Sequence, residues 1–173
     1  CIRDRSMAAS IVLLVLAPKS LKFACVVYML ASLVLFAMSA VYHMGSWPKS
    51  VDAILRRFDH ANIFLLIAGT YTPISFGLLA GRDRVILLSV VWVGAVLGIA
   101  TSLIWPHAPR WVNTILYVVL GWVALMYFPE LYAASLPAFW MLVAGGLAYT
   151  VGAVVYATKW PNPDPDVFGF HEF

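Results

Sequence analysis

Apolar residues in this chain form long windows, near 22 to 43, 60 to 80, 85 to 105, 112 to 131 and 138 to 158, with short polar joints between them. A helix that crosses a bilayer core of about 30 Å needs roughly 20 mostly apolar residues. Lipid offers no hydrogen bonds to the backbone, so a spanning segment must satisfy its own. The pattern therefore predicts an all-α fold, a multi-pass transmembrane helix bundle that forms a single domain over residues 1–173.

Both ends of the chain carry shorter apolar runs. The run "MAASIVLLVLA", residues 7–17, would rise only about 16 Å as a helix, so we interpret it as a first helix truncated at its N-terminus. A signal peptide is the alternative, because Arg3 and Arg5 precede the run and "APKS" resembles a weak cleavage site. Near the other end, "VFGFHEF" follows the turn-forming "WPNPDPD", which predicts the start of a truncated last helix.

Composition narrows the class of protein. The chain is 63% hydrophobic and 11% charged, whereas a soluble domain carries about 25% charged residues. The formal charge of +3 does not indicate a nucleic-acid partner, because the basic residues lie in the joints between windows. Two cysteines, Cys1 and Cys25, provide neither a disulfide framework nor a metal-binding spacing.

The basic residues also predict the orientation in the membrane. Cytoplasmic loops carry an excess of Lys and Arg, and alternate sides of the predicted bundle carry unequal numbers of them. One side holds Arg3, Arg5, Lys49, Arg56, Arg57, Arg110 and Lys159, and the other holds Lys19, Lys22, Arg82 and Arg84. We therefore expect the first side to face the cytoplasm.

Several polar residues border the joints on that side. His43 ends the second predicted segment, Asp59 and His60 begin the third, and His171 begins the last. Helices are about 10 to 12 Å in diameter, so side chains at neighbouring helix ends can converge. Ser39 stands four residues before His43, on the same helical face and one turn deeper. The group could hold a metal ion, with Ser39 bonded to a ligand or to its water.

Structural readings of the same residues remain open. Asp59 could cap the N-terminus of the third helix, where a carboxylate suits the helix dipole. His60 points about 100° away from Asp59 around a helix, and a lone interfacial histidine is often only hydrogen-bonded. His107 lies between two prolines in "WPHAPR". It is interpreted as a loop residue, with a role as a spare metal ligand as the alternative.

The blocks "SAVYH", "RRFDHANIFLLIAGTYTP" and "YTVGAVVYATKWPNPDPDVFGFHEF" together resemble the hemolysin III family. This is the bacterial branch of the progestin and adipoQ receptor proteins and is similar in pattern to the alkaline ceramidases. The resemblance implies a seven-helix protein of the bacterial inner membrane. It also implies a Zn²⁺ site with His43 and His171 as ligands, and with Asp59 and Ser39 in catalytic roles.

The sequence departs from the family pattern at both ends. The second histidine of the last motif would stand four residues after His171, beyond the last residue, Phe173. The family's Glu, Asn and His before the first helix would precede Cys1. The resemblance thus implies that this stretch carries one zinc ligand fewer than the family's full set.

Three classes of function remain, of which a retinal-type or ligand-gated heptahelical receptor is the third, because no lysine lies inside a late predicted helix to carry a Schiff base. Histidines from two helices with a water in the fourth position form the open arrangement typical of catalytic zinc, and the ceramidase-like relatives imply a lipid amide as substrate within the membrane lipid. The alternative is a non-enzymatic membrane protein, a cytolysin or pore-former or a regulator of membrane lipid composition. A pore needs a polar stripe along several helices, which these windows do not supply, and the sequence leaves the oligomeric state open.

Two scaffold predictions complete the interpretation. Gly94 and Gly98 stand four residues apart, a spacing that allows close helix approach. Pro73 is expected to kink or end the third helix.

Overall fold

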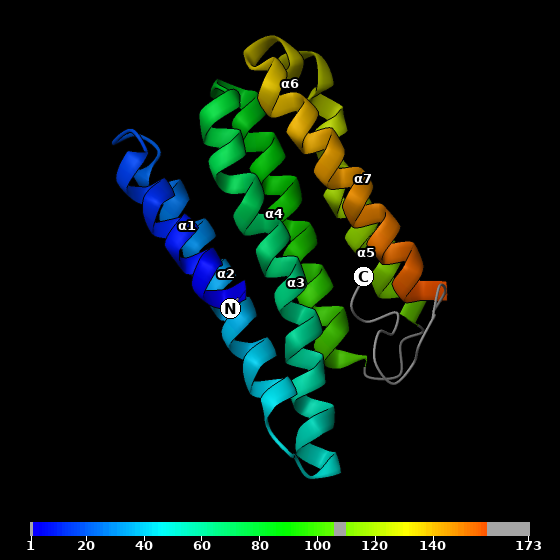
Figure 1. Ribbon diagram of the computed structural model, residues 1–173. Coiled ribbons are helices and arrows are strands. Elements are labelled where there is room, and N and C mark those ends of the chain that lie inside the picture. Colours follow the sequence, from blue (N-terminus) through cyan, green and yellow to red (C-terminus); the bar gives the residue numbers. More distant parts are fainter. Residues whose placement is uncertain (1, 106–109, 159–173) are drawn as a thin grey trace. The chain divides into compact units, whose positions relative to one another are not determined.

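The computed structural model describes residues 2–105 and 110–158, and the side chains of 7–105 and 111–155. The described residues form helices joined by short connections and contain no strand, which confirms the predicted all-α class (Figure 1). The elements are α1 (Ile2–Leu16), α2 (Lys22–Met44), α3 (Lys49–Leu78), α4 (Gly81–Ile104), α5 (Arg110–Gly121), the 3₁₀ helix η1 (Val123–Tyr127), α6 (Phe128–Ala134) and α7 (Leu136–Thr158).

Five stretches in the described part of the chain are long and apolar enough to cross a membrane. They are Lys22–Met44, Lys49–Leu78, Gly81–Ile104, Trp111–Ala134 and Leu136–Val155. Each corresponds to one predicted window, and α2 agrees with its window to within one residue. The first apolar run lies in α1, and its apolar part, Met7–Leu16, is shorter than a span. The protein is therefore a multi-pass membrane protein.

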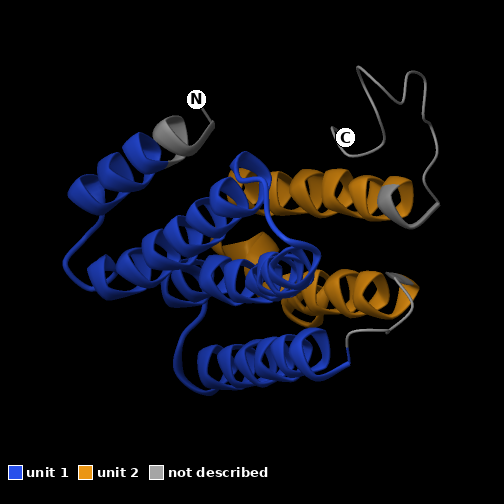
Figure 2. Ribbon diagram, turned by 90° about the horizontal axis from the view of Figure 1, so that it is seen from below, with its two compact units in different colours: residues 1–107 blue, residues 108–173 orange. Residues whose placement is uncertain are grey.

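The chain divides into two compact units, residues 1–107 and 108–173, shown in different colours in Figure 2. The single domain predicted for residues 1–173 stays a prediction. In the first unit α3 lies between α2 and α4, and α1 packs against α2 (Figure 1).

Small residues set the spacing of the three long helices in the first unit. A Cβ atom on Gly69 of α3 would lie 2.6 Å from the Cβ of Ala31 on α2. A Cβ on Gly98 of α4 would overlap the ring of Phe64 on α3, which confirms the predicted close approach at Gly98. Phe64 is 1% exposed, so this contact is part of the core between α3 and α4.

The start of α3 differs from the prediction. The apolar window begins near residue 60, but the helix begins at Lys49, with Pro48 at its N-cap and Asp52 in its first turn. Residues 49–59 carry several charged side chains, so hydropathy alone did not mark them as helical. Asp59 therefore lies inside α3, and both the predicted position at the helix start and the capping alternative are wrong.

Pro73 does not end α3, which continues to Leu78. The proline has no N–H to offer the Gly69 carbonyl one turn earlier. Nearby hydroxyls bond the same stretch of backbone, since Thr70 Oγ1 donates to the Leu66 carbonyl at 2.8 Å and Thr72 Oγ1 to the Ala68 carbonyl at 2.9 Å. Packing between α2 and α4 also holds both halves of the helix, which is how membrane helices tolerate proline.

The second unit contains the remaining elements. The window predicted at 112 to 131 is interrupted, because α5 ends at Gly121 and the 3₁₀ helix η1 leads into α6, which carries Pro129 in its first turn. Helix α7 packs against α5 and α6. The Trp122 indole Nε1 donates to Thr150 Oγ1 at 2.8 Å, and Thr150 in turn donates to the Gly146 carbonyl at 2.7 Å. This chain of bonds links the end of α5 to α7.

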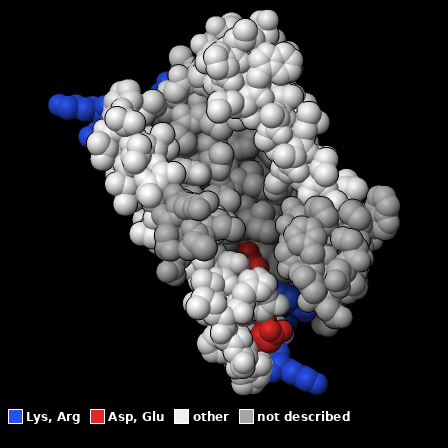
Figure 3. All heavy atoms as spheres, in the orientation of Figure 1, with Lys and Arg blue, Asp and Glu red and all other residues white. Residues whose placement is uncertain are grey.

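Charge is segregated along the first unit. Figure 3 shows one group of charged side chains at the lower end, over the junction of α2 and α3, and basic side chains at the opposite end, and the described residues visible between them are uncharged. On α4, Val93, Val96 and Leu97 are each about 60% exposed. Such an apolar belt between charged ends fits a bilayer's hydrocarbon layer.

Candidate metal centre

His43 stands in the last turn of α2, where the helix leaves its apolar stretch. Its imidazole is exposed and lies beside the Tyr42 ring, with the two ring centroids 4.6 Å apart and the planes tilted by 59°. Neither ring nitrogen has a hydrogen-bond partner among the described residues. The side chain is therefore available to a ligand.

The short connection after α2 is held by Trp47. Its indole Nε1 donates to the Val41 carbonyl at 3.0 Å, and Val41 is in the last turn of α2. Carbonyls at a helix C-terminus lack helical partners, so this bond replaces one that the helix itself cannot make. The indole thereby fixes the turn that carries His43.

The register of α2 against α3 brings Ser39 and Asp59 to the same end of the first unit. The contact between Ala31 and Gly69 aligns the two helices. Ser39 is eight residues beyond Ala31 and Asp59 is ten residues before Gly69. At 1.5 Å per residue, Ser39 and Asp59 lie about 12 and 15 Å from that contact, in the same direction. His43 is one further turn along α2, about 18 Å from it.

Asp59 and His60 differ in their local bonding. Asp59 is half-buried, and its carboxylate has no hydrogen-bond or ion-pair partner among the described residues. His60 Nδ1 lies 2.6 Å from the Arg56 carbonyl, one turn earlier in the same helix. This bond fits the structural reading of His60, as a histidine bonded to its own helix.

Two further polar residues at this end were missed in the sequence. Asn62 is one turn after Asp59 on α3, and its Nδ2 is buried without a hydrogen-bond partner. Ser102 of α4 has a buried Oγ that also lacks a partner. The contact of Gly98 with Phe64 aligns α4 with α3. Measured along the helix axes, the height of Ser102 then differs by roughly 3 Å or less from the heights of Asp59 and Asn62. The Asp-x-x-Asn spacing was the available signal for Asn62.

Buried polar atoms in proteins are nearly always hydrogen-bonded, so a group of unbonded ones needs an explanation. Here they come from two neighbouring helices, with Asn62 on α3 and Ser102 on α4. The Ser39 hydroxyl on α2 likewise has no partner among the described residues. The end of the first unit near Asp59 thus collects polar groups that a ligand or water could satisfy.

The described residues do not form a complete metal site. Among the described side chains, those of residues 7–105 and 111–155, no group of three His, Cys, Asp or Glu could hold a metal ion. His171, the second predicted zinc ligand, and His107, the spare ligand, both lie outside the described residues. The donor types fit zinc, since imidazole is one of its usual ligands, but of the two predicted ligands the described part contains only His43.

The helices and the polar end of the first unit together define an integral membrane protein with a candidate ligand site at the ends of its helices. Comparison with known proteins identifies its family: residues 6–173 match the family model described as Haemolysin-III related. The chain therefore belongs to the haemolysin III family, as the sequence blocks predicted.

Two relatives in bacteria support this membership. The chain is 35% identical to the "Hemolysin-3 homolog" of Bacillus subtilis (strain 168) over 134 residues, covering 77% of this chain and 62% of that protein. It is 33% identical to "Hemolysin-3" of Bacillus cereus over 156 residues, covering 87% of this chain and 71% of that protein. The chain thus spans less than two thirds of the first of these relatives. No solved structure matches it.

Proposed function

We propose that this protein is a zinc-dependent hydrolase of the bacterial inner membrane and that it cleaves a lipid amide at the cytoplasmic face. The observation that carries the proposal is the group of unbonded polar side chains, Ser39, Asp59 and Asn62, near the exposed His43. Polar groups within a membrane protein are costly and usually functional. They lie near the C-terminus of α2 and at the start of the apolar part of α3, a position that suits a substrate entering from the lipid.

His43 and His171 are the proposed zinc ligands, with further ligands outside the described residues. When bound, zinc supplies Lewis-acid activation, lowering the pKa of a coordinated water to about 7. His43 suits this role because no described residue occupies its ring nitrogens. The indole of Trp47 holds the turn that orients it.

Asp59 is the proposed general base. Its half-buried carboxylate can accept a hydrogen bond from a water and take its proton as the water attacks the amide carbon. Asp59 lies inside α3, where the backbone N–H groups around it already make helical hydrogen bonds. Its carboxylate is therefore not needed as a helix cap. Ser39, on the facing part of α2, can donate a hydrogen bond to the same water or to the substrate carbonyl.

The alternative function is a cytolysin or a regulator of membrane composition. It is favoured by the name "Hemolysin-3" given to the Bacillus cereus relative. The apolar surfaces of the described helices argue against a pore formed by one chain, because a water-filled channel needs polar side chains along its length.

The deciding experiment uses the full natural protein in lipid vesicles. We expect zinc in near-stoichiometric amount and release of fatty acid from a ceramide-type lipid amide, with both lost on treatment with a chelator and regained with added zinc. Leakage of a vesicle-trapped dye without any amide cleavage would instead favour the cytolysin. Absence of zinc from active protein would refute the metal centre.

A further inference from the structure

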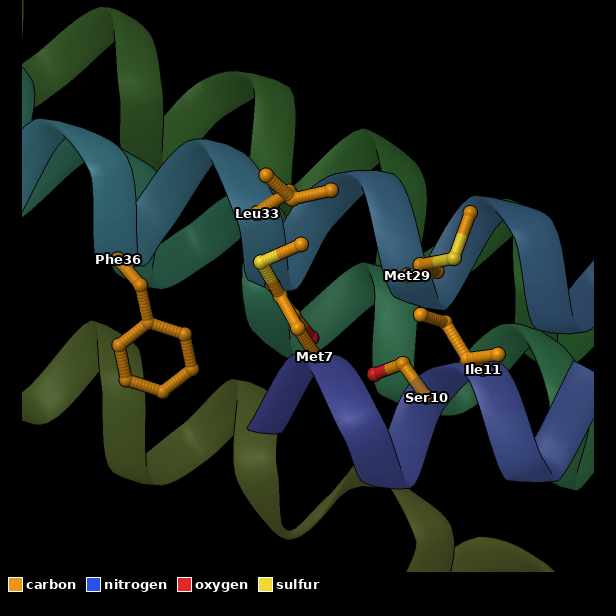
Figure 4. A pocket seen from close by; sticks show the side chains of 7 residues that line it. Met7, Ser10, Ile11, Met29, Leu33 and Phe36 are labelled. Atoms are coloured by element: carbon orange, nitrogen blue, oxygen red, sulfur yellow. The ribbon is translucent and has the colours of Figure 1, made fainter. Parts of the chain in front are cut away.

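A cavity of about 260 Å³ lies between α1 and α2 in the first unit. Figure 4 shows its walls: Met7, Ser10 and Ile11 come from α1, and Met29, Leu33 and Phe36 come from α2. Ser32 of α2 completes the lining. The large side chains are apolar and two of them are flexible methionines, which adapt to irregular apolar shapes.

Two small buried residues create the space. Ser10 is 4% exposed and Ser32 is 3% exposed, and they lie in the facing walls of α1 and α2. Because each carries a single hydroxyl where a larger side chain would fill the interface, the helices enclose a space between them.

The depth of the cavity decides which molecules can reach it. Met29 is seven residues from the start of α2 and Phe36 is eight residues from its end, so each is roughly 10 to 12 Å from the nearer helix terminus. At that depth a bilayer offers hydrocarbon chains. Water is disfavoured, because a buried water needs two to four polar partners, and of the two serines that line the cavity Ser10 already has a partner.

The outer rim of the cavity borders this hydrocarbon. Met7 is 40% exposed and Ile11 is 51% exposed, so the α1 side of the opening lies at the surface of the first unit. A cavity of about 150 Å³ is enough to hold benzene in another protein, and this one is larger. An empty cavity of this kind forfeits dispersion contacts with its walls, which a flexible chain restores.

We propose that the space between α1 and α2 binds one acyl chain of a bilayer lipid. The chain enters past Met7 and Ile11 and lies along α2 from Phe36 to Met29. Chain binding needs no metal and therefore does not rest on the hydrolase proposal.

The test uses the protein in phosphatidylcholine vesicles that contain a trace of the same lipid with a photoreactive diazirine in the middle of one acyl chain. After illumination, mass spectrometry measures labelling of Met29 and Phe36 relative to Val96, a lipid-facing residue of α4 that is 60% exposed. We expect Met29 and Phe36 to be labelled, and the labelling to be unchanged by a chelator.

Variants decide between a bound chain and general contact with lipid. Ser32→Leu fills the cavity and should abolish labelling of Phe36 while Val96 keeps its label. Ser32→Ala is the matched control, which leaves the cavity open and should keep the labelling. Met29→Trp fills the cavity from another point of the wall and replaces Ser32→Leu in the test if that variant does not fold. Folding is judged by circular dichroism and size-exclusion chromatography.

Three results would overturn the proposal. The first is the absence of label from Met29 and Phe36, as expected if another protein segment occupies the space. The second is labelling that persists in both filling variants, because the lipid then only surrounds the helix. The third is loss of labelling in Ser32→Ala, because the occupant would then depend on the hydroxyl and would not be a plain acyl chain.

Discussion

Gly69 of α3 and Ala31 of α2 meet so closely that a Cβ on the glycine would lie 2.6 Å from the alanine Cβ. This contact sets the register between the two helices. It also determines that Ser39 and Asp59, which are far apart in the sequence, lie at the same end of the first unit. The geometry of the candidate site thus depends on a glycine more than two helical turns away.

Substitution of Gly69 by alanine should destabilise the protein. The added methyl group forces the helices apart, and overpacking of this kind typically costs about 1 to 3 kcal/mol. We expect a lower thermal unfolding midpoint in detergent, measured by circular dichroism. The separation of α2 from α3 should also weaken zinc binding.

Gly145→Ala provides the matched control for this prediction. Gly145 lies within α7, and a Cβ there would meet nothing within 4 Å. Alanine is the better helix former by about 1 kcal/mol, so this variant should be as stable as the parent or more so. Equal destabilisation of both variants would show that the contact with Ala31 is not tight.

Trp47→Phe should loosen the end of α2. The variant keeps an aromatic ring and loses the indole N–H that donates to the Val41 carbonyl, a bond of a type worth about 0.5 to 1.5 kcal/mol. Hydrogen exchange measured by mass spectrometry should become faster in the peptide that contains residues 41–46. Zinc affinity should fall in parallel, because His43 lies in that turn.

Trp111→Phe is the corresponding control, because Trp111 is 60% exposed and lies in the second unit. Exchange at residues 41–46 should not change in this variant. If Trp47→Phe likewise leaves the exchange unchanged, the bond to Val41 does not hold the turn.

His43→Ala and Asp59→Asn should separate metal binding from turnover in the full-length protein. A direct ligand holds the ion, whereas a carboxylate that positions water acts mainly on the reaction. We expect His43→Ala to lose both zinc and lipid-amide hydrolysis, and Asp59→Asn to retain most zinc but lose turnover. Zinc is measured by mass spectrometry of the metal and turnover by fatty-acid release.

His60→Gln is the control for these two variants, because His60 already bonds the Arg56 carbonyl. This variant should keep both zinc binding and lipid-amide hydrolysis. Equal loss of zinc from His43→Ala and Asp59→Asn would make Asp59 a direct ligand, and unchanged hydrolysis in both would end the enzyme proposal.

The fold class followed from the sequence because lipid imposes a simple rule. A span must be apolar over its whole length, and that length is read directly from the residues. The window at 22 to 43 therefore matched α2, Lys22–Met44. The rule does not apply where a helix extends beyond the hydrocarbon, which is why residues 49–59 of α3 were not predicted.

Breaks within the apolar windows were harder to predict. Pro73 predicted a kink or an end of α3, and the helix does not end there but continues to Leu78 between two packed neighbours. The window at 112 to 131 showed no comparable signal before Pro129, yet α5 stops at Gly121. For Pro73 the helix is held by its packing against α2 and α4, which a single sequence does not reveal.

The candidate site was predicted in part. The spacing of Ser39 and His43 on one helix is a property of the sequence. Whether Asp59 on α3 lies at the same height as Ser39 on α2 depends on the contact between Gly69 and Ala31. Asn62 and Ser102 became candidates only when the structure showed their buried, unbonded atoms. His171 and its role as a zinc ligand stay a prediction.

Asn62 offers a test in which stability and function should change in opposite directions. Its Nδ2 is buried without a partner, and an unsatisfied buried polar group costs about 1 to 3 kcal/mol. Asn62→Leu replaces the amide by an apolar group of similar size, so the unfolding midpoint should rise. If Asn62 serves the site beside Asp59, hydrolysis should fall in the same variant, as expected when a site sacrifices stability for function.

Ser75→Ala is the comparison for Asn62→Leu. Ser75 is also on α3, and its buried Oγ also lacks a partner, but it lies sixteen residues from Asp59, about 24 Å along the helix. Its substitution should raise stability or leave it unchanged, without affecting hydrolysis. A loss of stability in Asn62→Leu would mean that the amide has a structural partner in the intact protein. Unchanged hydrolysis together with higher stability would remove Asn62 from the proposed site and leave Asp59 to position the water alone.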